Sequence, residues 1–288
     1  MSKPKILIQI DPDAHASVFD AVVAVDSGVD HLLQYHGVEP TQVRDLVHGA
    51  IFTRGPADLK QTAIFIGGQN VDAGEDLLRC VTDSFFGPMR VSVLLDANGA
   101  NTTAAAAVIA AARHLDLRGS KTLVLAATGP VGKRAARLLA RQGAHVRVGS
   151  RSADRSKTLR NQLLEQVPDA EIEAVQTATG HEVTAALDGV QLVIAAGAAG
   201  FELLDGPTRV AAESLQVAID LNAVPPLGIA GVEVMDKGQE RDGMICYGAI
   251  GVGGTKMKLH KAAVQKLFES NDQVIDAEEA FAIGQTLE

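Results

Sequence analysis

Short hydrophobic runs alternate with amphipathic segments along the first part of the chain. In the amphipathic segments apolar residues recur at helical spacing, whereas the short runs have the length and bounds of buried strands. Ser17 and Asn101 stand where N-caps of two of the helices belong. We expect strands at residues 5–10, 62–67 and 91–96, and helices at residues 17–26, 72–86 and 102–115.

A second alternating series begins at residue 122. Strands that alternate with helices of this length indicate β-α-β units and a parallel sheet. Two further helices, at residues 255–270 and 276–286, follow the series. Within it we expect strands at residues 122–126, 145–149, 171–175, 190–195 and 216–219, and helices at residues 131–142, 154–166 and 181–187.

The two series predict an α/β protein with two domains. A chain of 288 residues is long enough for two domains of ordinary size. We place the joints near residues 101–102 and 248–255, so that the tail packs back on the first domain. The predicted domains are residues 1–101 with 255–288, and residues 102–254, the latter with a Rossmann-type sheet.

Composition narrows the function classes. Hydrophobic residues make up 47% and aromatic residues 3% of the chain, with no Trp, so the core must be aliphatic and a base-stacking surface for nucleic acid is not expected. The formal net charge is −9 and no basic run is present, which argues against binding of duplex nucleic acid. No apolar run reaches the roughly 18–20 residues that span a bilayer.

Cysteine and histidine usage predicts neither a disulfide framework nor a metal site. Cys80 and Cys246 are the only cysteines, and there is no CxxC, so a cytoplasmic location is expected. The amino-terminal residues read as a strand rather than a signal peptide. No HExxH or paired-ligand spacing occurs, and no GxSxG nucleophile elbow is present.

The strongest local motif is ATGPVG at residues 127–132, between the strand at 122–126 and the helix at 131–142. It has GxGxxG spacing with Ala127 in the first position. Gly129 lets the backbone approach a pyrophosphate, and Gly132 lets helix and strand pack closely. The alternative is a βα turn that binds nothing. The predicted cofactor-binding residues here are Thr128, Gly129, Pro130, Val131 and Gly132.

The end of the next strand distinguishes the two nicotinamide cofactors. An NAD site usually has Asp or Glu there, whereas this chain has Ser150, Arg151 and Ser152, with Arg155 one turn further. Hydroxyl and guanidinium donors suit a 2′-phosphate, so we expect NADP. A solvated basic loop is the alternative. Asp154 is expected to cap the following helix rather than to bind ribose.

Small residues end two later strands of the same series. Ala196 and Gly197 follow the strand at 190–195, and Asn222 follows the strand at 216–219. At the carboxyl edge of a parallel sheet such residues leave room for ribose and nicotinamide. Tight helix–sheet packing is the alternative interpretation. We include Ala196, Gly197 and Asn222 among the cofactor-binding residues.

Several stretches together resemble the bacterial methylene-tetrahydromethanopterin dehydrogenases, and the resemblance covers nearly the whole chain. Ala127 departs from the glycine common in that family. The stretches are SVFDAVV (17–23), QTAIFIGG (61–68), FFGPMRVSVLLDANGANTTAAA (85–106), ATGPVG (127–132), NAVPPLGI (222–229) and GAIGVGGTKMKLHKA (248–262).

The resemblance implies oxidation of methylene- to methenyl-tetrahydromethanopterin in formaldehyde oxidation, with NADP or NAD as acceptor. It also implies a discontinuous pterin domain made of both chain ends, and a homo-oligomer, a trimer or hexamer. Two alternatives stay open. The first is the same reaction on methylene-tetrahydrofolate. The second is a non-catalytic NADP-binding sensor, which would need only the Rossmann half of the chain.

The reaction implied by the resemblance transfers a hydride and leaves a cation flanked by two nitrogens. A carboxylate near this cation would stabilise it, and Asp20 is the leading candidate. A surface Asp in the first turn of a helix is the alternative. Lys256 and His260 share a helix face at i and i+4, after an expected loop at 251–254. We assign Lys256 to catalysis and His260 to substrate binding, with a packing role as the alternative for His260.

Further substrate-binding residues are expected from the same stretches and from the strand ends. Ser17 and Phe19 precede Asp20 in SVFDAVV. Asn98 and Thr102 lie between a strand end and a helix start, where α/β sheets bind ligands. Thr53 and Gln61 precede the strand at 62–67.

Overall fold

The computed structural model describes residues 3–288 and divides into two units. The first unit extends to Thr102 and resumes at Met257, and the second runs from Thr103 to Lys256. Each unit has its own sheet, with five strands in the first and seven in the second. All strand pairs except one are parallel, so the predicted α/β class is confirmed.

Both boundaries between the units fall inside helices, α4 (Ala100–Ala112) and α9 (Ala249–Lys266). The expected loop at residues 251–254 is wrong, because these residues belong to α9. Gly251 serves close packing, because a Cβ there would overlap the backbone oxygen of Asp236.

The first unit has the strand order β12-β4-β3-β1-β2. Its strands are β1 (Ile6–Ile10), β2 (His31–Tyr35), β3 (Thr62–Ile66), β4 (Ser92–Leu95) and β12 (Val274–Ile275). Its helices are α1 (Val18–Asp26), α2 (Pro40–Ile51), α3 (Val71–Asp83) and α10 (Ala277–Gln285), with short 3-10 helices η1 (Pro56–Gln61) and η2 (Ala97–Gly99). Strand β12, near the end of the chain, pairs with β4.

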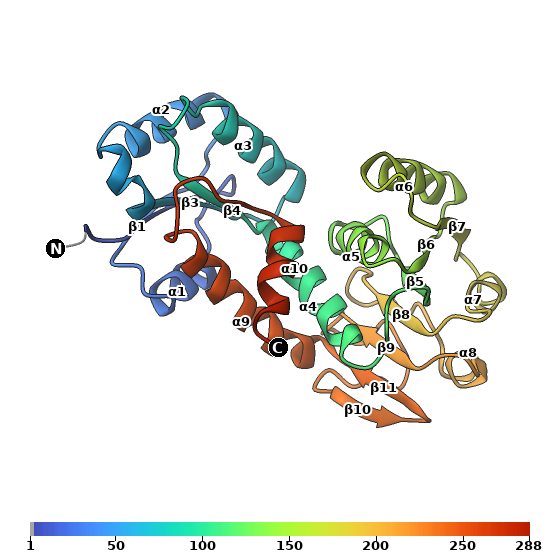
Figure 1. The fold of residues 1–288 in the computed structure, drawn as a ribbon. Helices are drawn as coiled ribbons and strands as arrows, with labels where there is room; N and C mark the ends of the chain where they lie inside the picture. The colour runs from blue at the N-terminus through green and yellow to red at the C-terminus, as the bar shows by residue number, and fades with distance from the viewer. Residues whose placement is uncertain (1–2) are drawn as a thin grey trace. The chain divides into compact units, whose positions relative to one another are not determined.

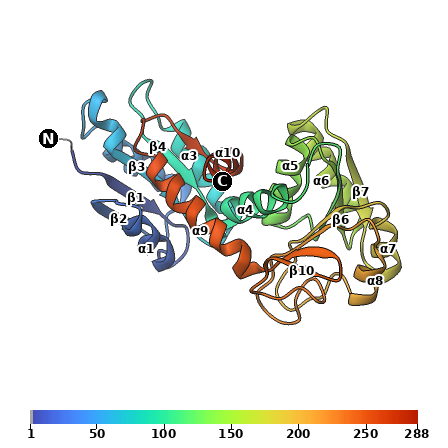
Figure 2. The ribbon, with the colours of Figure 1, turned by 60° about the horizontal axis from the view of Figure 1, so that its bottom comes forward.

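Helices cover both faces of this sheet. α2 and α3 lie on one face, and α1 lies on the other together with the carboxyl-terminal part of α9 (Figures 1 and 2). Lys261 of α9 forms a 2.8 Å ion pair with Asp26 of α1. The central strand β3 is buried along its whole length, which explains its continuous apolar run.

Asn101 and strand β2 are two of the places where the first unit differs from expectation. Asn101 is not an N-cap: it lies inside α4, which follows η2 directly, and its side-chain amide donates to the Leu95 carbonyl. Strand β2 was not predicted, because an edge strand that is mostly exposed carries polar residues and loses the apolar signal.

The second unit has the strand order β10-β11-β9-β8-β5-β6-β7. Only β10 is antiparallel, to β11. Its strands are β5 (Lys121–Leu125), β6 (His145–Ser150), β7 (Ile172–Gln176), β8 (Leu192–Ala195), β9 (Val217–Asp220), β10 (Lys237–Arg241) and β11 (Met244–Tyr247). Its helices are α5 (Pro130–Arg141), α6 (Ala153–Gln166), α7 (Gly180–Ala186) and α8 (Gly206–Ala211), beside the residues of α4 and α9 that it includes.

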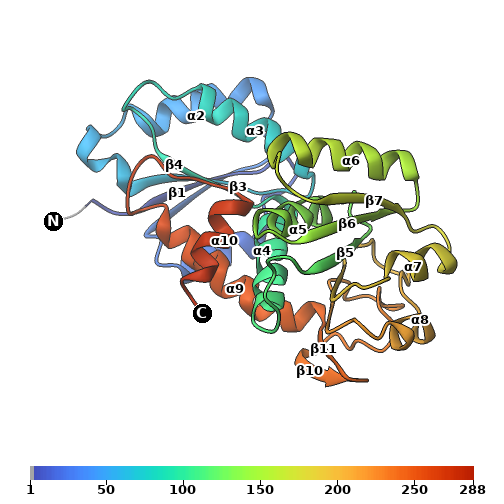
Figure 3. The ribbon, with the colours of Figure 1, turned by 45° about the vertical axis from the view of Figure 1, so that its right-hand side comes forward.

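This arrangement is the Rossmann order, read from β7 through β5 to β11. Helices α5 and α6 lie on one face of the sheet, and α7 and α8 lie on the other (Figure 3). The chain changes direction across the sheet between β5 and β8, and the carboxyl ends of these strands form the switch point. Ser152, not Asp154, caps α6, because its hydroxyl accepts from the Arg155 N–H.

Candidate functional site

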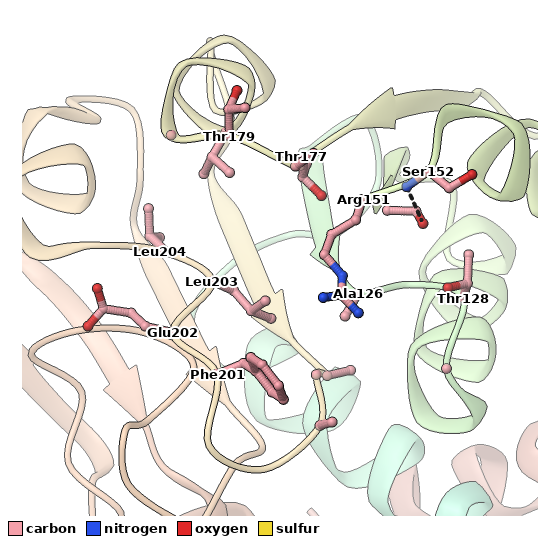
Figure 4. Close-up of a pocket in the computed structure, with 18 of the residues that line it drawn as sticks. Ala126, Thr128, Arg151, Ser152, Thr177, Thr179, Phe201, Glu202, Leu203 and Leu204 are labelled. Carbon is pink, nitrogen blue, oxygen red and sulfur yellow. Dashed lines mark hydrogen bonds between the residues drawn. The ribbon is translucent and has the colours of Figure 1, made fainter.

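A pocket of about 460 Å³ lies at the switch point of the second unit (Figure 4). This size falls within the range of small-molecule sites. Loops that follow β5, β6, β7 and β8 contribute its walls. The lining residues are Ala126, Thr128, Gly129, Ser150, Arg151, Ser152, Arg155, Thr177, Ala178, Thr179, Gly180, Val183, Ala196, Gly197, Ala198, Phe201, Glu202, Leu203, Leu204 and Asp205.

The turn from β5 into α5 is built for close backbone approach. A Cβ on Gly132 would lie 2.8 Å from the Cα of Ala127 and 2.9 Å from the Ala126 carbonyl oxygen, so no side chain fits. Ala126 has a φ of 53°, in the left-handed region. Gly129 is the N-cap of α5 and Pro130 its first residue, an arrangement in which the first amides of the helix lack acceptors within the helix and can bind an anion.

The end of β6 supplies the polar wall of this pocket. The Ser152 N–H donates to the Ser150 hydroxyl over 3.3 Å, and the Ser152 hydroxyl accepts from the Arg155 N–H. The Arg151 guanidinium carbon lies 5.9 Å from the centre of the Phe201 ring. Ser150 is buried, whereas Arg151 and Arg155 are exposed. The pocket therefore has two guanidinium groups and two hydroxyls where an NAD site usually has a carboxylate.

Most of the predicted cofactor residues line this pocket. Pro130, Val131, Gly132 and Asn222 do not, although the first three form the start of α5. Asn222 is buried, and its side-chain amide donates to the Pro226 carbonyl while its oxygen accepts from the Val224 N–H. The polar atoms of the Asn222 side chain therefore stabilise the loop that follows β9.

Sequence reasoning missed the wall that follows β7 and, beyond Ala196 and Gly197, the rest of the loop after β8. Thr177 follows β7 directly, and Thr179 caps α7. Both could have been found from the rule that ligands bind at the carboxyl ends of parallel strands. Phe201 had no such signal, because the loop after β8 has no motif that places one side chain in the pocket.

The buried Asp220 holds the loop that follows β9. Its carboxylate accepts from the Asn222 N–H over 3.0 Å and from the Ile229 N–H over 2.8 Å. A Cβ on Gly228 would lie 2.8 Å from its Oδ1 atom. Burial raises the pKa of Asp220, against the lowering effect of these hydrogen bonds.

The first unit also has a switch point, between β1 and β3. Asp11 and Gly67 follow these two strands, and Asp20 comes from the first turn of α1. A Cβ on Gly67 would lie 3.2 Å from Oδ2 of Asp20 and 3.4 Å from Oδ2 of Asp11. Two carboxylates therefore converge on the glycine at the carboxyl edge of the sheet, where α/β proteins bind ligands.

Asp11 organises the loop that leads to Asp20. This fully buried carboxylate accepts from the Asp13 N–H over 2.9 Å and from the Ser17 N–H over 3.2 Å. The Ser17 hydroxyl in turn accepts from the Asp20 N–H over 3.2 Å. Ser17 is thus the N-cap of α1, as the sequence predicted. Burial raises the pKa of Asp11. Sequence reasoning missed this residue, although it directly follows a strand.

Aromatic rings lie beside this edge of the sheet. The ring of buried His260 stacks on Phe65 with a centroid distance of 5.6 Å and lies 6.4 Å from the ring of Phe19. Nδ1 of His260 is 3.8 Å from Oδ2 of Asp96. Asp96 also accepts from the N–H and the hydroxyl of Thr102. Thr102 and His260 are thus both buried around Asp96.

The other predicted substrate residues are spread over the first unit. Asn98 is exposed at the carboxyl end of β4, and its N–H donates to the Gly68 carbonyl. Thr53 and Gln61 lie at the opposite edge, where the chain enters the amino end of β3. Lys256 is half-buried and is the last residue of the second unit. Among the described residues, no group of three or more potential metal ligands gathers.

Comparison with known proteins identifies the family. A family model described as methylene-tetrahydromethanopterin dehydrogenase, N-terminal, matches residues 18–98. The chain is 44% identical to a protein of Methylorubrum extorquens named bifunctional protein MdtA, with 100% of both chains covered. The chain belongs to the methylene-tetrahydromethanopterin dehydrogenase family. A second relative from the same organism, an NAD(P)-dependent methylenetetrahydromethanopterin dehydrogenase, is 31% identical over 96% of this chain and 97% of its own.

Solved structures show the same fold at low identity. Ligand-free 5-ketofructose reductase of Gluconobacter sp. strain CHM43 aligns with a TM-score of 0.54 at 15% identity, over 99% of each chain. Shikimate 5-dehydrogenase of Listeria monocytogenes aligns with a TM-score of 0.52 at 13% identity, over 99% of this chain and 96% of that one. Within residues 3–288, no helix has both the length and the apolar character needed to cross a membrane.

Proposed function

We propose that this chain is an NADP-dependent dehydrogenase that oxidises methylene-tetrahydromethanopterin to methenyl-tetrahydromethanopterin in the oxidation of formaldehyde. The pocket at the β5/β8 switch point is the observation that carries this proposal. It combines a glycine turn with Ser150, Arg151 and Ser152. The name of the second relative supports the pterin substrate and a nicotinamide cofactor, and the matching family model also supports the pterin substrate.

The residues of the second unit fit a dinucleotide. At Gly132 no Cβ is tolerated, which lets α5 begin close to the end of β5, while Gly129 leaves the backbone of the turn open to a pyrophosphate beside the start of α5. Ser150, Arg151, Ser152 and Arg155 would surround a 2′-phosphate, and Ala196 and Gly197 would leave room for the nicotinamide half. When bound, the cofactor supplies an acceptor for one hydride, that is, one proton with two electrons.

The chemistry asked of the protein is orientation and electrostatics. The substrate carbon loses a hydride, and the positive charge that remains is shared by its two neighbouring nitrogens. No proton leaves, so no general base is required. The protein has to align the reactants, exclude water and stabilise the cation. We assign the last task to Asp20, whose carboxylate lies beside Gly67 at the carboxyl edge of the first sheet.

We assign substrate binding to residues around that edge. Ser17 holds Asp20 through the cap of α1, Phe19 lies beside His260, and Asn98 is exposed at the end of β4. Lys256 is proposed to bind or polarise polar groups of the pterin. Thr102 and His260 are proposed to support the site indirectly, through their contacts with Asp96. Thr53 and Gln61 lie near the amino end of β3, outside this edge of the sheet.

We also propose a cytoplasmic homo-oligomer, a trimer or hexamer. Val18, Val22 and Val25 share one face of α1, and each is more than half exposed, which supports association with a second copy. Both cysteines are free thiols, which supports a reducing compartment. No observation on the described residues favours a tetrahydrofolate substrate or a non-catalytic sensor.

The proposal is tested by following methenyl formation and NADPH absorbance with purified protein. We expect turnover with NADP and methylene-tetrahydromethanopterin to exceed turnover with NAD or with methylene-tetrahydrofolate. Asp20→Asn should reduce kcat while NADPH still binds. If neither pterin is turned over although NADPH binds tightly, the sensor hypothesis replaces the enzyme. Faster turnover with tetrahydrofolate would reassign the substrate.

A further inference from the structure

Arg151 and Phe201 face each other across the cofactor pocket of the second unit. Arg151 follows β6 and Phe201 belongs to the loop after β8, so they come from opposite walls (Figure 4). The guanidinium carbon is 5.9 Å from the ring centroid, within the range of a cation–π interaction. In Figure 4 the Arg151 side chain extends toward Ala126, and Phe201 lies on the loop beside it.

Hydrogen bonds anchor the backbone of Arg151 and the chain just after Phe201. The Arg151 carbonyl accepts from the side-chain amide of Gln176 over 3.2 Å. The N–H groups of Leu203 and Leu204, just after Phe201, donate to the Gly228 carbonyl over 2.8 and 3.1 Å. Hydrogen bonds therefore hold the two backbone segments that carry these side chains.

The Phe201 ring does little for the hydrophobic core, because 57% of the residue is exposed. The guanidinium of Arg151 lies within reach of its ring. Long arginine side chains lose rotamer freedom when they bind a ligand. A ring that already restrains the guanidinium reduces that loss.

The geometry of a guanidinium allows both partners at once. Its flat face stacks on an aromatic ring, while its N–H donors point outward in the plane and bind phosphate oxygens. A ring on the face of Arg151 thus leaves the donors available. Ser150, Ser152 and Arg155 line the same pocket and would supply the other phosphate contacts.

We propose that Phe201 is a positioning residue, which holds the Arg151 guanidinium ready for the 2′-phosphate of NADP and so raises the selectivity for NADP over NAD. This inference rests on the proposed 2′-phosphate site. It adds a specificity determinant that is itself uncharged and comes from the loop after β8.

The test is a fluorescence titration with NADPH and NADH, which requires no pterin. Phe201→Leu keeps an apolar side chain but removes the ring, and we expect the Kd of NADPH to rise roughly two- to fivefold with that of NADH unchanged. Phe201→Tyr keeps the ring and should behave as wild type. Phe86→Leu, at an exposed phenylalanine of the other unit, is the matched control and should change neither Kd.

A double-mutant comparison isolates the pair. In an Arg151→Ala background, Phe201→Leu should have no further effect on NADPH. An effect that persists there, equal weakening of NADPH and NADH, tighter binding of both, or no change in either would overturn the role of Phe201. Failure of the 2′-phosphate site itself would look different, because Arg151→Ala alone would then leave the ratio of the two Kd values unchanged.

Discussion

The Asp20 carboxylate lies 3.2 Å from the point where a Cβ on Gly67 would stand. This distance is tighter than an ordinary van der Waals contact, and the Phe65 ring lies 3.1 Å from the same point. Gly67 therefore sets how closely Asp20 approaches the edge of the sheet, and with it the place of the negative charge in the proposed site.

Gly67→Ala is expected to displace the Asp20 carboxylate and to lower kcat by about tenfold or more, because small misplacements of catalytic groups are costly. Steady-state kinetics with NADP in excess measures this. Gly49→Ala is the matched control, since a Cβ there meets no atom within 4 Å. Equal kcat values for Gly67→Ala and wild type would contradict the assigned role of Asp20.

Gly132 and Gly129 should respond differently to alanine. At Gly132 the added Cβ meets backbone atoms at 2.8–2.9 Å, so we expect overpacking to destabilise the protein by about 1–3 kcal/mol. At Gly129 the nearest atom is 3.5 Å away, so folding should be preserved while NADPH binding weakens, because the methyl would enter the pyrophosphate path. Urea denaturation measures the loss of stability, and NADPH titration measures the loss of affinity. Wild-type affinity in Gly129→Ala would place the cofactor elsewhere.

The two cysteines should differ in reactivity. Cys246 is fully buried, and burial raises its thiol pKa to about 11, so very little thiolate forms at neutral pH. Cys80 is only half-buried. A thiol reagent at pH 8 should modify only Cys80 in the native protein and both cysteines after denaturation, as mass spectrometry of the labelled peptides would show. Rapid native labelling of Cys246 would contradict its burial.

Asp220 should make a pH-dependent contribution to stability. Burial raises its pKa in the folded state, so the folded protein binds a proton more readily than the unfolded chain. Its contribution is fully present below the unfolded pKa and is lost as the pH rises through the folded value. The free energy of unfolding of wild type relative to Asp220→Asn should therefore fall as pH rises from about 4 toward neutrality. Urea denaturation across this range tests the sign, and a relative stability that increases with pH would contradict it.

The elements that the sequence predicted well are those buried on both faces. Strands such as β3 and β5 contain apolar runs. The GxGxxG spacing of residues 127–132 predicts the turn that contains Gly132. The missed edge strands β2 and β10 are largely exposed and carry polar residues. The loop expected at 251–254 was wrong because glycine was interpreted as a loop signal, whereas Gly251 permits α9 to pack against the Asp236 backbone.

The candidate sites were predictable only where one short stretch holds the signal. Ser150, Arg151 and Ser152 are consecutive and end a recognisable strand. Thr177 could be inferred only from its place after β7, and nothing in the neighbours of Phe201 along the sequence indicates that it joins them. Likewise Asp11 and Gly67 meet Asp20 through the order of β1 and β3, which periodicity does not reveal.

The most direct test of the account is the kinetic comparison of wild type with Arg151→Ala, using NADP and NAD in turn with methylene-tetrahydromethanopterin. Because a guanidinium–phosphate contact is charge-assisted, the KM for NADP should rise roughly ten- to a hundredfold while that for NAD changes little. Arg141→Ala, on an exposed helix end outside the pocket, serves as the control. Equal changes in the two KM values would contradict the assignment of a 2′-phosphate site at the end of β6.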